Sequence, residues 1–128
     1  MIDIENKVFD KIYTKVSAAY PEANITSEYV REVSTFPHVS IVEISNTVYR
    51  NASELSRVEC MANITYEVNV YSNELIEKKQ QCKEIIALID ETMASMGFIR
   101  TFLNPVQNME DATIYRMTGR WQIVTGGI

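Results

Sequence analysis

The residues of this chain whose side chains could act in catalysis stand at spacings that fit no common catalytic motif. His38 is the sole histidine, and no acid or nucleophile stands at a recognised spacing from it, so we expect a histidine at a strand edge. Glu110 and Asp111 could bind a hard cation, but the oxygen-rich spacing of a calcium loop is missing around them. The four glycines form neither a P-loop nor a dinucleotide fingerprint. We therefore expect no enzymatic activity, no catalytic residues, no cofactor and no bound metal.

The two cysteines, Cys60 and Cys82, are too far apart for a Cys-x-x-Cys redox motif. Each falls on the apolar side of its segment, which favours small buried hydrophobic residues over a redox pair. The first residues, "MIDIENKVFD", are acidic and amphipathic and lack the basic and apolar regions of a secretory signal. We therefore expect a cytoplasmic protein with reduced cysteines.

The composition is that of an ordinary globular protein. A length of 128 residues, 46% apolar and 23% charged, predicts one domain over residues 1–128. No apolar run reaches the ~20 residues that span a bilayer, so we expect no membrane partner. The net charge of −5 argues against a general nucleic-acid binder, because such binding relies on lysine and arginine. An acidic surface would still suit a channel through which DNA slides.

Two amphipathic helices are predicted. The first covers residues 3–19, with Asp3 as a possible cap and an end at Tyr20-Pro21, where the residue before proline leaves helical geometry. The second covers residues 74–96, after Ser72 and Asn73 as N-cap residues, and stops at Gly97. Its apolar stripe is expected to contain Leu75, Cys82, Ile86, Ile89, Met93 and Met96.

Strand patterns fill most of the remaining chain. A strand starts at His38 and continues or turns after Ser45, and residues 25–30 read weakly as a short strand. Between Val58 and Val70 the even positions are apolar or small and most odd positions polar, which predicts one buried and one wet face. A hairpin follows, with strands at 98–103 and 112–124 and a loop at 104–111. These elements predict an α+β fold, a two-layer sandwich of an antiparallel sheet with both helices packed on one face.

The stretches "NVYSNE" and "GFIRTFLNPVQNMEDATIYRMTGRW", with the long helix between them, resemble the tail terminator, or tail-completion, proteins of long-tailed bacteriophages and prophages of Gram-positive hosts. The resemblance covers residues 66–124. Gln107 stands where the family more often has proline. The positions that fit the family pattern are Phe98, Arg100, Pro105, Asn108, Asp111, Ala112, Tyr115 and Arg116.

The resemblance implies a structural virion protein of the tail-neck region that is present in the host cytoplasm during assembly. Such proteins form a six-membered ring on the finished tail tube, end its elongation and join tail to head. The implied partners are other copies of the chain, the major tail tube protein, the head-tail connector protein and genomic DNA that passes without specific binding. Two alternatives remain open: a head-completion or connector protein of the same neck region, and a small-molecule-binding or enzymatic α+β domain.

The predicted interface lies on the wet strand faces and on the hairpin loop. Opposite charges there could pair across the sheet within one subunit or between subunits. If they pair between subunits, Arg116→Ala and Asp111→Ala should weaken the ring and leave the subunit's own stability almost unchanged. The expected interface residues are Glu59, Glu67, Asn104, Pro105, Asn108, Glu110, Asp111, Arg116 and Arg120.

Overall fold

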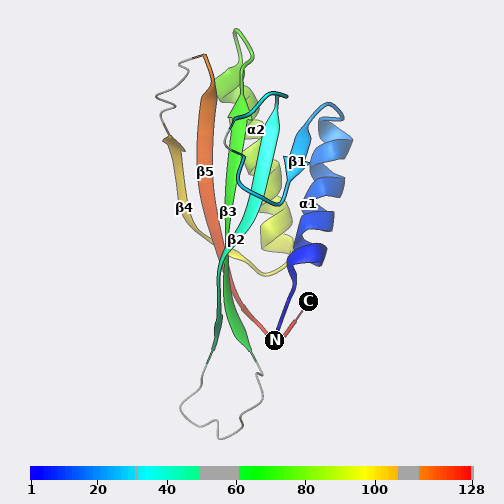
Figure 1. Cartoon of the computed structure of the whole chain (residues 1–128), viewed down its shortest axis with the longest axis vertical. Helices are drawn as coiled ribbons and strands as arrows, with labels where there is room; N and C mark the ends of the chain where they lie inside the picture. Colours follow the sequence, from blue (N-terminus) through cyan, green and yellow to red (C-terminus); the bar gives the residue numbers. More distant parts are fainter. Residues whose placement is uncertain (31, 50–60, 107–112, 128) are drawn as a thin grey trace, which may run out of the picture.

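A five-stranded mixed sheet carries two helices on one face in the computed structural model, which describes residues 1–30, 32–49, 61–106 and 113–127 (Figure 1). The strand order is β1-β2-β3-β5-β4, so the last strand lies between the third and the fourth. The elements are α1 (Glu5–Ala19), β1 (Asn24–Thr26), β2 (His38–Val48), β3 (Ala62–Ser72), α2 (Lys78–Ser95), β4 (Ile99–Val106) and β5 (Tyr115–Thr125).

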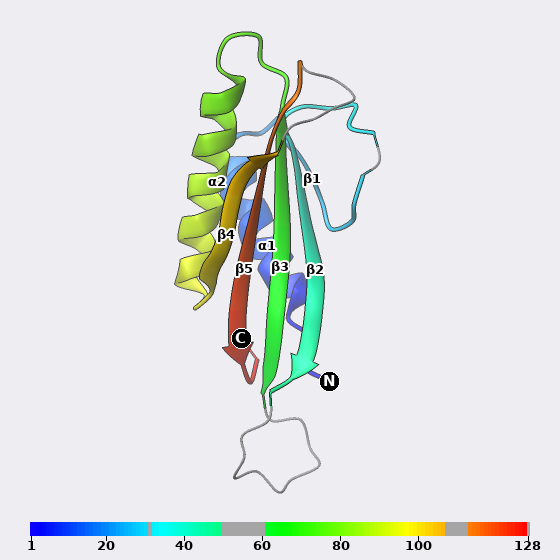
Figure 2. The same ribbon diagram turned by 90° about the vertical axis from the view of Figure 1, so that its left-hand side faces the viewer.

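The predicted two-layer α+β sandwich is confirmed, because both helices lie on the same side of the sheet (Figures 1 and 2). The sheet is mixed, whereas the sequence predicted an antiparallel one: β1 runs parallel to β2, with Asn24 opposite His38. The other pairs are antiparallel. The parallel pair arises because residues 27–30 and 32–37, here called the crossing segment, pass over the face opposite the helices before β2 begins (Figure 2).

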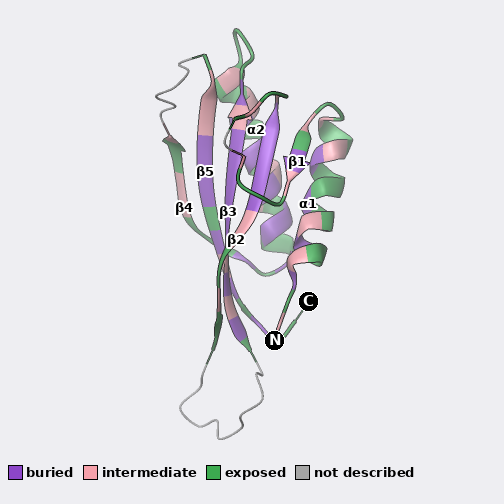
Figure 3. Cartoon of the chain, in the orientation of Figure 1, coloured by how far each residue is buried: buried purple, intermediate pink, exposed green. Residues whose placement is uncertain are grey.

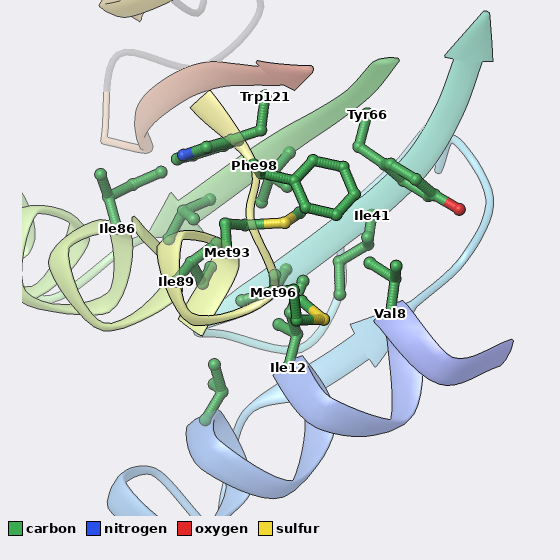
Figure 4. Close-up of a cluster of buried hydrophobic side chains, with 14 of the residues drawn as sticks. Val8, Ile12, Ile41, Tyr66, Ile86, Ile89, Met93, Met96, Phe98 and Trp121 are labelled. Atoms are coloured by element: carbon green, nitrogen blue, oxygen red, sulfur yellow. The ribbon is translucent and has the colours of Figure 1, made fainter. Parts of the chain in front are cut away.

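The core lies between the helices and the inner face of the sheet (Figure 4). Trp121 of β5 is fully buried, and its indole Nε1 donates a hydrogen bond of 2.9 Å to Asp90 of α2. Tyr66 of β3 meets the Phe98 ring edge-on at 5.7 Å between centroids. The helices contribute fully buried apolar side chains at helical spacing: Val8, Ile12 and Val16 from α1, and Cys82, Ile85, Ile89 and Met93 from α2. Cys82, Ile89 and Met93 were predicted in the stripe of the second helix, whereas Ile85 was not.

Gly119 leaves room for the Trp121 indole. The two residues lie on the same face of β5, and a Cβ added at Gly119 would lie 2.5 Å from the nearest ring carbon. Since real Cβ atoms do not approach other atoms so closely, any larger residue here would displace the largest side chain of the core.

The second helix begins later than the sequence predicted. Ser72 still pairs with Tyr115 as the last residue of β3, and α2 starts at Lys78 rather than at residue 74. Leu75 therefore precedes the helix and is 97% exposed, so its expected place in the buried stripe was wrong. The first helix likewise starts at Glu5, whose N–H donates to the Asp3 carboxylate over 3.1 Å.

The end of α2 fits its prediction. Gly97 has a φ of +94°, a left-handed conformation that glycine adopts without strain. The N–H of Gly97 donates to the Ala94 carbonyl and the N–H of Phe98 to the Met93 carbonyl, both at 3.0 Å. These two bonds make a Schellman motif, which turns the chain from the helix into β4.

The first strand of the β4–β5 hairpin is longer than the sequence predicted. β4 extends to Val106, so Asn104 and Pro105 lie in a strand and not in the expected loop. Pro105 lies opposite Met117 on the edge strand, a position where the missing N–H of proline is tolerated. A register shift between Arg100 and Phe102 marks a bulge in the same strand. Residues 107–112 of the hairpin loop lie outside the described residues.

Candidate functional site

The outer face of the sheet, on the side away from the helices, carries a hydrogen-bonded network around Asn69 of β3. Asn69 is fully buried, and its Oδ1 accepts bonds from Nε and Nη2 of Arg116 at 3.0 and 2.8 Å. The Thr118 hydroxyl donates to the same oxygen at 2.6 Å. The Asn69 amide nitrogen in turn donates to Glu67 at 3.3 Å. One asparagine thus joins two side chains of β5 to a carboxylate of β3.

Glu67 is the second centre of the network, and it is only 8% exposed. Arg120, directly opposite on β5, donates from Nε to Oε2 at 3.0 Å, and the Tyr29 hydroxyl donates to Oε1 at 3.2 Å. Burial alone would raise the pKa of Glu67, but the hydrogen bonds from Asn69, Arg120 and Tyr29 lower it below its ordinary value. The expected pairing of Glu67 with Arg120 therefore occurs within one subunit.

Two arginines on this face also lie against aromatic rings. The Arg116 guanidinium lies over Tyr71 at 5.4 Å from the ring centroid, and that of Arg120 lies over Phe102 at 5.2 Å. Because each ring and each acceptor fixes its arginine, the guanidinium groups are held in place before any partner arrives. Arg116 supports its own subunit, so the expectation that Arg116→Ala leaves subunit stability almost unchanged needs correction.

The crossing segment covers part of this face. The Glu28 carbonyl accepts hydrogen bonds from the hydroxyls of Ser40 at 3.0 Å and Thr26 at 3.1 Å. Together with the bond from Tyr29 to Glu67, these contacts hold the segment to three strands. Much of the middle of the outer face is buried despite its polar side chains, although Arg120 is exposed; the buried polar residues are His38, Ser40, Glu67, Asn69 and Thr118. Figure 3 shows buried stretches along β2, β3 and β5.

His38 is the first residue of β2, at the strand edge that the sequence predicted, and it lies beneath this cover. It is 1% exposed and pairs with Asn24 on one side and Tyr71 on the other. The Asn24 amide lies 3.2 Å from Nδ1, and the Thr26 hydroxyl lies 3.4 Å from Nε2. Since the Thr26 hydroxyl already donates to Glu28, it accepts from Nε2–H, and Nδ1 then accepts from Asn24. This arrangement satisfies a neutral imidazole, and burial lowers the pKa of His38.

Most of the expected interface residues that are described lie on or beside this face. Glu67, Arg116 and Arg120 are brought together through Asn69, and Asn104 is exposed opposite Thr118. Pro105 is exposed on the β4 edge, and its position opposite Met117 puts it in line with the inner face. Glu59, Asn108, Glu110 and Asp111 lie outside the described residues, as does Cys60.

Sequence reasoning missed two members of the network. The sequence placed Asn69 on the polar face of its strand, which is correct, but it predicted that this face would be wet, whereas Asn69 is fully buried. Its central position follows from the pairing of β3 with β5. Tyr29 lies in a stretch without periodicity, and no local signal links it to Glu67.

The described residues offer little for covalent chemistry. The Cys82 thiol is buried, contacts the Val70 carbonyl at 3.7 Å and has its pKa raised by burial to about 12. Among residues 1–30, 32–49, 61–106 and 113–127, no three histidine, cysteine, aspartate or glutamate side chains gather closely enough to hold a metal ion. In the same ranges no helix is long and apolar enough to cross a membrane.

Two hollows open on the surface. One of about 340 Å³ is acidic and contains Asp3, Glu5 and Glu43, and burial raises the pKa of Glu43, which accepts a bond from Tyr66 at 3.1 Å. The other, of about 610 Å³, lies between Tyr20 and the start of α2. In the second hollow the Tyr20 hydroxyl donates to the Glu84 carboxylate at 2.8 Å. Burial and this bond raise the pKa of Tyr20 to about 12, so its hydroxyl stays protonated near neutral pH.

The fold and the surface define the structural class of this protein. It is a two-layer α+β sandwich whose outer sheet face is polar, hydrogen-bonded and partly covered by the crossing segment. No known family model and no curated protein sequence matches this chain.

Proposed function

We propose that this chain is a tail terminator protein, which caps the tail tube of a long-tailed phage as a ring, ends its elongation and joins tail to head. The observation that carries the proposal is the resemblance over residues 66–124. Those residues are not scattered in space: they include most of β3, all of α2 and β4, and nearly all of β5, which lie side by side. The proposed location is the tail-neck region of the virion.

Several positions of the family pattern have clear roles in shaping this unit. Phe98 packs against Tyr66, where the chain leaves α2. Arg100 bonds to Asp90 at 3.2 Å, and Asp90 also accepts the Trp121 indole N–H, so this acid links α2 to both hairpin strands. Arg116 anchors β5 to Asn69. The shared residues thus fix how the hairpin lies on α2, which supports a common fold.

The outer face suits the docking of a neighbouring subunit or of the tube. Its hydrogen-bonding groups are held by one another, so little side-chain freedom would be lost on binding. The proposed interface residues remain those expected from the sequence; among the described ones, Asn104 and Arg120 are exposed on the outer face and Pro105 is exposed on the β4 edge.

Polymerising tail tube protein tests the proposal directly. When the chain is present during polymerisation, we expect shorter tubes with a ring at their ends in electron micrographs. Binding to the portal side alone would indicate the head-completion or connector function instead. Tubes of unchanged length without rings would overturn the proposal.

A matched pair of variants tests the docking face. Asn104→Arg adds a bulky charge to the exposed outer face and should abolish or weaken capping. Ala18→Arg adds the same side chain to the exposed side of α1 and should cap normally. If both variants cap the tubes equally well, the outer face is not part of the interface.

A further inference from the structure

The turn between β3 and α2 exposes two neighbouring aliphatic side chains almost completely. Leu75 is 97% exposed and Ile76 is 93% exposed. Both belong to residues 73–77, which connect the two elements at the end of the molecule opposite the chain termini (Figures 1 and 2). Because an apolar side chain stabilises a fold only when it leaves water, these two contribute little to the isolated chain. They are available to a partner.

Both side chains line the hollow of about 610 Å³ that lies between Tyr20 and the start of α2. Hydrogen bonds hold the polar walls of this hollow in place. The Tyr20 hydroxyl donates to Glu84 at 2.8 Å, and the Ser72 hydroxyl donates to the side chain of Gln81. Because these side chains are already ordered, little of their freedom would be lost when a partner enters.

The rim of the hollow is acidic. Glu74, Glu77 and Glu84 line it, whereas no lysine or arginine of the described chain does. Among the described residues, no ion pair joins any of these three carboxylates to a basic side chain. Lys78, the first residue of α2, donates to the carbonyl of Thr113, which precedes β5. The rim therefore keeps a negative charge that a basic partner could pair with.

The charges close to Tyr20 are negative as well. After burial and the bond to Glu84, the charges of Glu84 and Glu22 raise the pKa of the Tyr20 hydroxyl further. An acidic site of this kind disfavours two occupants. A second copy of the chain, with its net charge of −5, would add negative charge, and an anionic lipid surface would be repelled in the same way.

We propose that this hollow docks a segment of another protein that presents aliphatic side chains flanked by lysine or arginine. Leu75 and Ile76 would pack against the aliphatic side chains of that segment, so apolar surface of both chains leaves water. The rim carboxylates would pair with its basic groups and so select the partner and its orientation. The proposal goes beyond the proposed function, because the hollow lies beside the helices and away from the outer sheet face.

Titration of the isotope-labelled protein with the peptide acetyl-Lys-Lys-Leu-Leu-Lys-Lys-amide, followed by NMR, tests the proposal. The backbone amide signals of Tyr20 and of residues 74–84 should shift, and those of the outer sheet face should not. Leu75→Ser and Ile76→Ser should each raise the dissociation constant at least about fivefold, because each removes an apolar contact. Ile99→Ser makes the same change at a residue of β4 that is 72% exposed, and it should bind like the wild type.

Changes of charge test the rim. A peptide with glutamate in place of lysine should bind at least about tenfold more weakly, and so should one with serine in place of leucine. Glu77→Gln should weaken binding of the lysine peptide about threefold. Glu91→Gln is the matched control, because Glu91 is an exposed glutamate further along α2, and it should leave binding unchanged.

Any of three results would overturn the proposal: a spectrum that the lysine peptide leaves unchanged, shifts that centre away from the hollow, or equal affinity for the lysine and glutamate peptides. Thermal unfolding of each variant checks that it is folded, and the substituted positions are chosen on the surface so that folding is retained. Tube capping is measured separately, so each proposal stands or falls on its own result.

Discussion

Asn69 gathers three hydrogen bonds on one buried oxygen, and two of them come from the charged group of Arg116. Its amide nitrogen donates to Glu67, which holds Arg120. A polar residue in this position stabilises the sheet only while all partners are satisfied, because an unpaired buried group costs more than a single bond contributes.

Replacing Asn69 by alanine should therefore lower the free energy of unfolding by about 1 to 3 kcal/mol, because Thr118 and Arg116 lose their acceptor. Urea unfolding would measure the change. Asn63→Ala is the matched control on the same strand and face, since Asn63 is half-buried and accepts one bond, from Gln122. Equal losses of unfolding free energy in the two variants would show that the network around Asn69 contributes no more to stability than the single bond of Asn63.

The sequence allowed part of this site to be predicted. Alternation along the strand placed Glu67 and Asn69 on one face, and the same pattern placed Arg116 and Arg120 on the matching face of β5. The partner of each residue could not be predicted, because it depends on the register between strands that are far apart in the chain. Asn69 and Arg116 meet only because Tyr71 lies opposite Arg116 and Asn69 opposite Thr118.

At the scale of elements, α2 is held by its apolar stripe. Ile89 is fully buried in that stripe, between the sheet and the other core side chains (Figure 4). Ile89→Ala should cost about 2 to 5 kcal/mol of unfolding free energy, because it removes buried methyl groups and leaves a cavity.

The control for this helix variant is Ile76→Ala, which removes the same atoms from a side chain that is 93% exposed. It should change stability by no more than about 0.5 kcal/mol. Chemical denaturation of both variants gives the comparison, and a wild-type stability for Ile89→Ala would contradict the packing of α2 on the sheet.

Long periodic elements were predictable, and short or edge elements were not. The stripes of α1 and α2 repeat over several turns, so local pattern determined them. β1 has three residues and forms through its pairing with β2, and β4 extends through Pro105 because an edge strand tolerates proline. Ser72 was a reasonable cap by residue type, but pairing with β5 keeps it in a strand.

At the scale of the whole molecule, His38 makes stability depend on pH. Its pKa is lowered by burial, so over the range between the folded and unfolded pKa values the unfolded chain binds more protons. Stability should therefore fall as the pH drops below the ordinary histidine pKa of 6.5. Protonation would also place a donor at Nδ1 against the Asn24 amide and loosen β1 and the crossing segment.

Thermal unfolding between about pH 5.5 and 7 tests this effect, since most carboxylates titrate at lower pH. Glu43, whose pKa is raised by burial, is present in both the wild type and the His38→Gln variant, so the comparison between them reports on His38. The melting temperature of the wild type should decline towards the acid end. His38→Gln should show a flatter profile, whatever its absolute stability, because the chain then has no histidine. Identical slopes for the two proteins would rule out His38 as the cause.

The position of β5 between β3 and β4 has a consequence for the ribosome-bound chain. β5 supplies Trp121 and pairs with β3 from Ala62–Thr125 to Ser72–Tyr115. Until residue 125 has left the exit tunnel, β3 lacks one neighbour, β4 lacks its only described partner, and α2 lacks the indole that binds Asp90. The β2–β3 hairpin and both helices can form early, but their apolar faces stay open to solvent during synthesis. This domain should therefore complete its folding only after residue 125 has emerged, and until then nascent chains should rely on chaperones to keep these surfaces from aggregating.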